Sequence, residues 1–213
     1  MGYESPMPVQ EEVIPFLLGD DNDVIALAQT GTGKTAAFGL PILQKIDVTT
    51  YHPQALVLCP TRELCLQIAD DLNDYSKYID NLKVLPVYGG SSIESQIKTL
   101  KRGVHVVVAT PGRLLDLMNR KTVDLSLVKN VIMDEADEML NMGFTDSINA
   151  ILAEVPENRN MLLFSATMPK EIANITKKYM KNPKEIVIGN KNEGNKNIRD
   201  IYYMVQARDK YLA

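Results

Sequence analysis

The stretch DVIALAQTGTGKT, Asp23 to Thr35, decides the fold class of this chain. Its first half is a short apolar run, which predicts a buried strand over Asp23–Ala28. Glycines follow at positions 31 and 33, and the letters GKT then begin a helical pattern. A glycine-rich turn between a strand and a helix lets successive backbone N–H groups surround a phosphate. We therefore predict a phosphate-binding loop here, rather than an ordinary flexible turn.

The predicted loop offers a bound nucleotide a continuous set of contacts. Lys34 can reach the β and γ phosphates, and Thr35 can present its hydroxyl to Mg²⁺. Ala28 stands where the general pattern has glycine. The residues expected to contact the nucleotide are Ala28, Gln29, Thr30, Gly31, Thr32, Gly33, Lys34 and Thr35.

Short apolar runs alternate with longer amphipathic stretches on either side of this loop. Near-continuous apolar strands joined by helices indicate a parallel sheet that is covered on both faces. The sequence therefore predicts a three-layer α/β domain with a mostly parallel central sheet of about seven strands. The further strands are expected at Ala55–Cys59, Lys83–Tyr88, Val104–Ala109, Asn130–Asp134, Met161–Ser165 and Glu185–Gly189.

Four carboxylates stand close together where the predicted strand Asn130–Asp134 ends: Asp134, Glu135, Asp137 and Glu138. Crowded acids at the end of a buried strand are costly unless a cation or a hydrogen-bond donor lies opposite them. The strand can end beside the phosphate loop, so Asp134 would hold Mg²⁺ and Glu135 would activate the attacking water. The alternative is an acidic helix N-terminus, which suits Asp137 and Glu138 better than Asp134.

Four more clusters of small, polar or charged residues follow predicted strands, at Pro60–Leu64, Gly89–Gly90, Ala109–Arg113 and Ser165–Thr167. Ligands of open parallel sheets bind at the carboxyl edge of the strands. Each cluster alone could be ordinary turn chemistry. Together with the phosphate loop and the acids, they predict one crevice.

Composition restricts the kind of nucleic-acid contact that is possible. The 213 residues carry a net charge of −4, which argues against coating nucleic acid by bulk charge. A surplus of basic residues over Lys170–Arg199 is read as a solvated helix face and linker.

No apolar run is long enough to span a bilayer, and the first residues do not resemble a signal peptide, so a cytoplasmic protein is expected. Cys59 and Cys65 are expected to be small buried residues without a disulfide.

Taken in order, AQTGTGKT, PTREL, GG, TPGR, DEAD and SAT resemble the first RecA-like domain of a DEAD-box RNA helicase of bacterial type. The segment Gly2–Gln10 is similar to the adenine-reading Q motif of that family, although Met7 replaces its usual Thr or Ser and the family's upstream aromatic residue would precede Met1. The resemblance implies that Tyr3 and Gln10 contact ATP. A capping or solvent-facing Gln10 is the alternative.

The resemblance also implies ATP hydrolysis with Mg²⁺, catalysed through Lys34, Asp134 and Glu135. It implies coupling of hydrolysis to strand separation through Asp137, Ser165 and Thr167. Residues 1–200 would form the ATP-binding domain, and residues 201–213 a linker and the start of a second RecA-like domain that completes the ATP site and the RNA groove. The positions expected to contact the backbone of RNA, single-stranded or in a short duplex, are Pro60, Thr61, Arg62, Gly90, Thr110, Pro111, Gly112 and Arg113.

Two functions remain open from the sequence. The first is half of an ATP-dependent RNA helicase, nearly inactive without its second domain. The second is a nucleotide-gated clamp for RNA or protein with little turnover. Glu135 favours the first, because a clamp does not need a carboxylate that activates water.

Overall fold

A computed structural model describes residues 4–19, 23–29 and 31–188. Its centre is a seven-stranded sheet in the order β3-β4-β2-β5-β6-β1-β7, and every pair of neighbours is parallel. Each strand lies within two residues of its predicted position, so the predicted α/β sheet is confirmed and is parallel throughout. The strands are β1 (Val24–Leu27), β2 (Ala55–Leu58), β3 (Val84–Val87), β4 (Val106–Ala109), β5 (Asn130–Met133), β6 (Asn160–Ser165) and β7 (Lys184–Val187).

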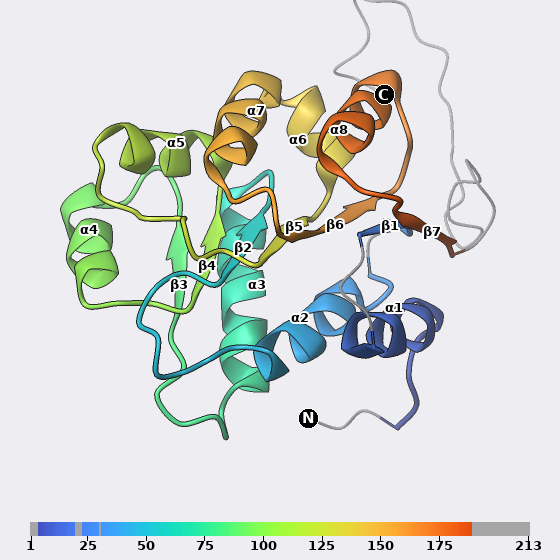
Figure 1. The fold of residues 1–213 in the computed structure, drawn as a ribbon, viewed down its shortest axis with the longest axis horizontal. Helices are drawn as coiled ribbons and strands as arrows, with labels where there is room; N and C mark the ends of the chain where they lie inside the picture. The colour runs from blue at the N-terminus through green and yellow to red at the C-terminus, as the bar shows by residue number, and fades with distance from the viewer. Residues whose placement is uncertain (1–3, 20–22, 30, 189–213) are drawn as a thin grey trace, which may run out of the picture.

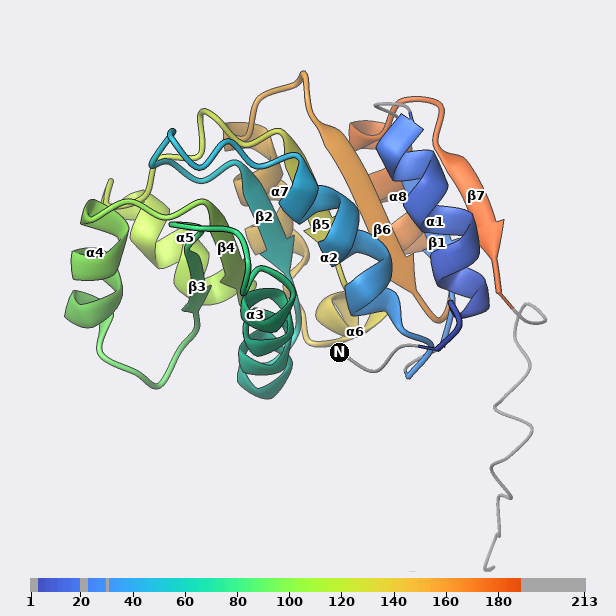
Figure 2. The same ribbon diagram turned by 90° about the horizontal axis from the view of Figure 1, so that it is seen from below.

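Helices cover both faces of the sheet (Figure 1). One face carries α1 (Pro8–Gly19), α2 (Lys34–Gln44) and α3 (Arg62–Tyr75). Figure 2 shows this face from below, with α1 and α2 in front of the sheet and α3 beside them. The other face carries α4 (Ile93–Lys101), α5 (Pro111–Asn119), α6 (Ala136–Asn141), α7 (Thr145–Glu154) and α8 (Lys170–Tyr179).

Two separate apolar cores hold the three layers together. Successive side chains of a strand point to opposite faces, and β1 divides accordingly: Ile25 and Leu27 join one core, whereas Val24 and Ala26 join the other. All four residues are buried. This two-sided burial explains why the strands are apolar at nearly every position and do not alternate with polar residues.

Local signals start the helices at the carboxyl edge of the sheet. The Thr61 hydroxyl caps α3 by accepting a hydrogen bond from the Leu64 N–H at 3.2 Å. Pro111 occupies the first turn of α5, where a missing N–H costs nothing. The helix starts therefore lie beside the strand ends from which the predicted site residues come.

Some predictions fall on residues that the structure does not describe: Tyr3, Thr30 and the segment 201–213. Cys59 and Cys65 are free and buried, as predicted for small core residues. Among the helices of the described residues, none is long and apolar enough to cross a membrane.

Candidate active site

The strand order brings the predicted clusters to one edge of the sheet. β2, β5, β6 and β1 are consecutive neighbours, and all of them run in the same direction. Their carboxyl ends lead directly into PTREL, DEAD, SAT and the phosphate loop. The loops after β3 and β4, which contain Gly90 and Thr110, continue the same edge.

The phosphate loop ends in a left-handed glycine. Gly33 has φ 81° and ψ 25° and is the N-cap of α2, so the helix begins at Lys34. A Cβ at position 33 would lie 2.5 Å from Nε2 of Gln10. Glycine is therefore required here for the backbone conformation, and a side chain at this position would also displace the Gln10 amide. Thr32 steadies the turn by donating its hydroxyl to the Gln29 carbonyl at 2.8 Å.

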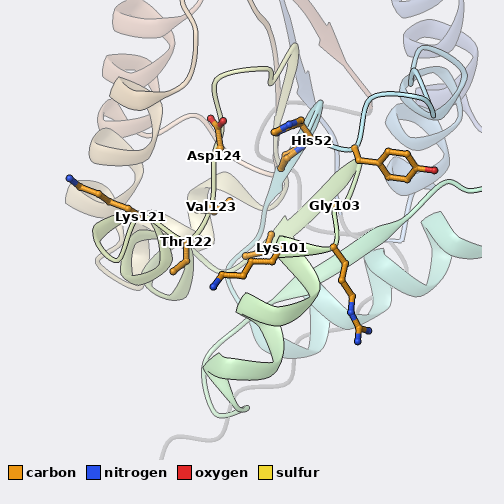
Figure 3. Close-up of a pocket in the computed structure, with 11 residues that line it drawn as sticks. His52, Lys101, Gly103, Lys121, Thr122, Val123 and Asp124 are labelled. Atoms are coloured by element: carbon orange, nitrogen blue, oxygen red, sulfur yellow. The ribbon is translucent and has the colours of Figure 1, made fainter.

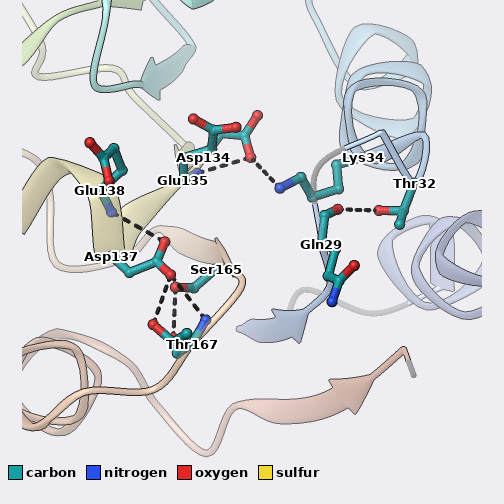
Figure 4. Close-up of polar contacts among 9 residues, drawn as sticks. All are labelled: Gln29, Thr32, Lys34, Asp134, Glu135, Asp137, Glu138, Ser165 and Thr167. Carbon is teal, nitrogen blue, oxygen red and sulfur yellow. Dashed lines mark hydrogen bonds and ion pairs between the residues drawn. The ribbon is translucent and has the colours of Figure 1, made fainter. Parts of the chain in front are cut away.

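Lys34 and Asp134 form a buried ion pair between the loop and the end of β5 (Figure 4). Nζ and Oδ1 are 3.5 Å apart, and the side chains are 7% and 4% exposed. Burial raises the pKa of Asp134, and the Lys34 charge opposes that shift. Lys34 is therefore the cation that lies opposite the crowded acids, and it pairs with Asp134.

Glu135 follows in a left-handed conformation, with φ 51° and ψ 50°, at the N-cap of α6. This conformation costs a residue with a Cβ about 1–2 kcal/mol. Burial raises the pKa of Glu135, and the neighbouring Asp134 raises it further. A strained, partly buried carboxyl with a raised pKa is the type of group that serves as a general base.

Asp137 joins α6 to the turn after β6. Its Oδ2 accepts hydrogen bonds from the N–H and the hydroxyl of Thr167, at 3.0 and 2.8 Å. The Ser165 hydroxyl donates to the Thr167 carbonyl at 2.7 Å, which closes the same turn (Figure 4). The three residues predicted to act together therefore form one bonded unit.

Gln10 is buried between α1 and the phosphate loop. Its Nε2 donates to the Gly33 carbonyl at 3.1 Å, and its Oε1 accepts from the Met7 N–H at 2.9 Å. The solvent-facing alternative is wrong, whereas the capping contact is present. Beside it lies a cavity of about 250 Å³ whose apolar lining includes Pro6, Ile14 and Leu40.

The two arginines predicted to contact RNA differ in exposure and in the hydrogen bonds that they already make. Arg62 is exposed, and its guanidinium lies 5.0 Å from the centre of the Tyr88 ring. Arg113 is half-buried, donates twice to the Ser91 carbonyl at 3.2 Å, and reaches Oε1 of Gln96 at 3.1 Å. Arg113 therefore anchors the loop after β3, and only part of its donor capacity is left for a ligand.

The remaining predicted RNA positions fall into two groups. The side chains of Pro60 and Pro111 are buried and serve the fold, while Gly90 and Gly112 are exposed. Thr61 and Thr110 are partly exposed N-caps of α3 and α5.

Three positioning residues were missed by sequence reasoning. Buried Gln96 donates to the Tyr88 carbonyl at 3.1 Å and to the Ser91 hydroxyl at 2.7 Å, which shapes the loop that Arg113 holds. Asp71 forms a hydrogen bond with Thr35, while burial raises the pKa of Asp71. Tyr88 supports Arg62, and its place just before the two glycines was the one signal that could have revealed it.

A parallel sheet with a glycine loop, a buried Lys–Asp pair and a neighbouring acid defines a P-loop nucleotide-binding protein. Comparison with known proteins then identifies the family. The DEAD/DEAH box helicase model matches residues 7–175, and the chain belongs to that family.

Relatives and solved structures agree with this assignment. The ATP-dependent RNA helicase DeaD of Mycobacterium tuberculosis (strain H37Rv) is 51% identical over 205 residues, which cover 96% of this chain and 36% of DeaD. The DEAD-box ATP-dependent RNA helicase CshA of Bacillus cereus is 48% identical over 211 residues, covering 99% of this chain and 40% of CshA. The crystal structure of a DEAD box protein from Methanococcus jannaschii matches with a TM-score of 0.83 and 46% identity, covering 87% of this chain and 50% of that one. The chain thus spans between about a third and a half of these proteins.

Proposed function

We propose that this chain is the ATP-binding half of an ATP-dependent RNA helicase. Together with a second RecA-like domain, it would hydrolyse ATP to ADP and phosphate while remodelling or unwinding short RNA duplexes. The observation that carries the proposal is the buried Lys34–Asp134 pair, with Glu135 directly beside it at the strand end. The names of the relatives, which are ATP-dependent RNA helicases, support the same activity.

The residues at this edge fit Mg²⁺ and a nucleotide triphosphate. Mg²⁺ is commonly held by one or two carboxylates, a hydroxyl and the phosphates, and it neutralises the charge that develops on them. Asp134 and Thr35 are the residues that would hold it. Asp134 is already 97% shielded from solvent and paired with a cation, so its site is built for positive charge.

Each protein group has a role that follows from its surroundings. Lys34 is the first residue of α2. When nucleotide binds, Lys34 would exchange its ion pair with Asp134 for contacts with the β and γ phosphates. Glu135 would accept the proton of the attacking water, since its raised pKa makes it a stronger base than an ordinary glutamate. Two hydrogen bonds join Asp137 to Thr167. A movement at the end of β5 during hydrolysis would therefore be transmitted through Asp137 to the turn after β6.

Adenine would be read beside α1. The Gln10 amide can donate to N7 and accept from N6 of adenine, a bidentate pair that discriminates by about 1–3 kcal/mol. Its present partners, the Gly33 carbonyl and the Met7 N–H, lie at the apolar cavity lined by Pro6, Ile14 and Leu40. On nucleotide binding, the Gln10 amide would therefore give up its bonds to Met7 and Gly33 and bond the adenine instead.

RNA would be bound through its backbone and without sequence preference. The exposed candidates at the carboxyl edge are an arginine, glycines and helix starts, which suit phosphate rather than base edges. The chain has no tryptophan and only 6% aromatic residues, which does not favour an extended stacking surface for bases.

A second domain would supply the remaining positive charge. Phosphoryl transfer commonly needs an arginine finger worth about 10³ to 10⁵ in rate. Among the arginines that the structure describes, Arg102 and Arg159 line pockets at the amino edge, and Arg120 pairs with Asp116 on α5. None of these three belongs to the predicted ATP site, which agrees with a finger supplied from elsewhere.

Turnover measurements on two chains test the proposal. The 213-residue chain should bind Mg²⁺·ATP but show almost no RNA-stimulated hydrolysis, whereas a chain with the second domain should show both hydrolysis and unwinding. Robust stimulated hydrolysis by the short chain would show that its site is complete. A longer chain that binds RNA in an ATP-dependent way without turnover would favour the clamp.

Calorimetry tests the phosphate loop separately. Lys34→Ala should greatly weaken nucleotide binding, because it removes the positive charge opposite the phosphates. Lys98→Ala, an exposed lysine of α4, is the matched control and should bind like the parent. Unchanged binding by Lys34→Ala, in a protein that still unfolds cooperatively, would contradict the assignment.

A further inference from the structure

A second charged pocket lies at the opposite edge of the sheet. Its volume is about 640 Å³, and it is formed at the amino ends of β1, β2, β5 and β6. These are the strands whose carboxyl ends carry the predicted ATP site. A four-residue strand spans roughly 13 Å, so the two sites are separate. The basic residues that line the pocket are Lys45, Lys129, Arg159 and Lys181.

The lining carries a strong surplus of positive charge, although the whole chain has a net charge of −4. Asp23 is the single acidic residue among the lining residues. Its two carboxylate oxygens already accept the N–H groups of Met161 and Lys181, at 2.6 and 2.5 Å. Asp23 therefore shapes the pocket and keeps its negative charge, which acts on Arg159, so the lining holds four basic side chains against one carboxylate.

Arg159 is the partly buried basic residue of the pocket lining. Its Nη1 donates to the carbonyls of Val155 and Pro156, at 3.4 and 2.6 Å, which fixes the guanidinium in place. Its Nε is buried and is the one such side-chain atom without a hydrogen-bond partner in the described part of the chain. A buried donor without a partner costs about 1–3 kcal/mol. Arg159 thus places a fixed guanidinium charge at the pocket.

Amide side chains line the same space, from Asn130, Asn158, Asn160 and Asn182, and the Asn160 amide donates to Oδ1 of Asn130 at 3.5 Å. Asp47 and Glu157 do not line the pocket, although the Asp47 carboxylate interacts with the charge of Lys129 and the Glu157 carboxylate with that of Arg159. A compact anion with several acceptor oxygens matches such a donor set, and a phosphate group has this chemistry.

We propose that this pocket binds a phosphate group through Arg159, Lys129 and Lys181. The group is a free phosphate or the 5′-terminal phosphate of an RNA, since both present the same oxygens. The site is independent of ATP hydrolysis and of the RNA surface at the carboxyl edge.

A second pocket at the same edge serves as a comparison, because its basic side chains do not converge. It is smaller, about 370 Å³, and lies between the segments around His52, Lys101 and Lys121 (Figure 3). The side chains of Lys101 and Lys121 do not converge on a common point in that view. Lys121 therefore provides a matched control, a cation at the same edge outside the proposed site.

The test is a titration of the 213-residue chain with inorganic phosphate, followed by the NMR signals of the side-chain amides of Asn158, Asn160 and Asn182. Saturable shifts are expected, and the Gly33 amide reports separately on the phosphate loop. Arg159→Gln should weaken binding about tenfold, and the exposed Lys129→Gln about two- to threefold. Lys121→Gln should leave the affinity unchanged.

Lys129→Gln keeps the test valid if Arg159→Gln fails to fold, because Lys129 is exposed. Two RNA oligonucleotides that differ only in a 5′-phosphate or a 5′-hydroxyl distinguish the sources. Tighter binding of the phosphorylated RNA that Lys129→Gln weakens about two- to threefold identifies the RNA end. Binding of inorganic phosphate alone identifies the free ion. Shifts that never saturate, or that persist equally in the Lys129 and Lys121 variants, would overturn the proposal.

Discussion

Oδ2 of Asp137 accepts both the N–H and the hydroxyl of Thr167, so the strand ends of β5 and β6 are tied together across 30 residues of sequence. A single carboxylate oxygen thereby connects the helix after Glu135 to the turn after β6. A movement of one strand end must either carry the other along or break these bonds.

Thr167→Ala should separate hydrolysis from unwinding in a chain that includes the second domain. The variant loses the hydroxyl bond to Asp137 but keeps the N–H bond, so stability should fall by only about 0.5 kcal/mol. ATP hydrolysis should be largely kept, whereas unwinding of a short duplex should fall. Thr176→Ala is the control, because the Thr176 hydroxyl donates to Ala173 within α8. Equal retention of both activities would remove the coupling role.

Glu135→Gln should leave ATP binding nearly intact while hydrolysis by the longer chain falls by at least about 10², the usual contribution of a general base. The substitution keeps the size of the side chain and removes its basicity. Glu138→Gln, at an exposed position of α6, is the matched control and should hydrolyse ATP normally. Single-turnover kinetics and calorimetry measure the two quantities, and parallel loss of both would indicate a structural role.

Glu135 also predicts a pH dependence of stability. Its pKa is raised in the folded protein, so the folded state holds the proton more tightly than the unfolded chain does. The contribution of Glu135 to the free energy of unfolding should therefore decrease as pH rises from about 4.3, the ordinary value, through the folded-state pKa.

Urea unfolding of parent and Glu135→Gln at a series of pH values measures this contribution. The variant should gain stability relative to the parent across that window and keep the gain at neutral pH. A gain that appears only on acidification would have the opposite sign and would contradict burial as the cause.

Gln10→Ala should reduce the preference for ATP over GTP. Guanine offers an acceptor at O6 where the Gln10 amide would also accept, so the parent should discriminate by about 1–3 kcal/mol. Because Gln10 also holds Gly33, the variant should bind both nucleotides more weakly. Competition binding measures the ratio, with the exposed Gln67→Ala as control. An unchanged ratio would leave Gln10 only its structural contacts with Met7 and Gly33.

Arg62→Ala should lower RNA affinity by a similar factor for unrelated sequences. It should also reduce the slope of log K against log salt concentration by about 1. Arg62 is exposed on the Tyr88 ring, so its removal should not change stability measurably. Arg113→Ala should weaken RNA binding and also lower the melting temperature, because it releases the Ser91 carbonyl and Gln96. Filter binding with two unrelated sequences checks both variants, and a marked preference for one sequence would contradict backbone binding.

The sheet was predictable because burial on both faces leaves a clear mark on each strand. Val106–Ala109 is a short, β-branched apolar run between polar or turn-forming segments, and this pattern favours a strand that is buried on both faces. The clustering of motifs followed in turn from the rule that parallel strands share their carboxyl edge.

Side-chain partners across the edge were not predictable, because they depend on strand order. Nothing in the sequence indicates that Arg113 bonds Ser91, which lies 22 residues away, since that needs β3 beside β4. The residues alone favoured a helix-dipole role for Asp137, and only the family resemblance suggested coupling. The left-handed backbone of Glu135 is likewise invisible in a sequence that shows no glycine there.

The place of β7 limits where this domain can be shortened. β7 pairs with β1 along four residues, Val24 to Leu27, although the family match ends at residue 175. A piece cut at that boundary would lose β7 and leave the strand that leads into the phosphate loop with unpaired N–H and C=O groups along one side. Exposed strand edges recruit other chains, so such a piece would aggregate through the strand on which nucleotide binding depends.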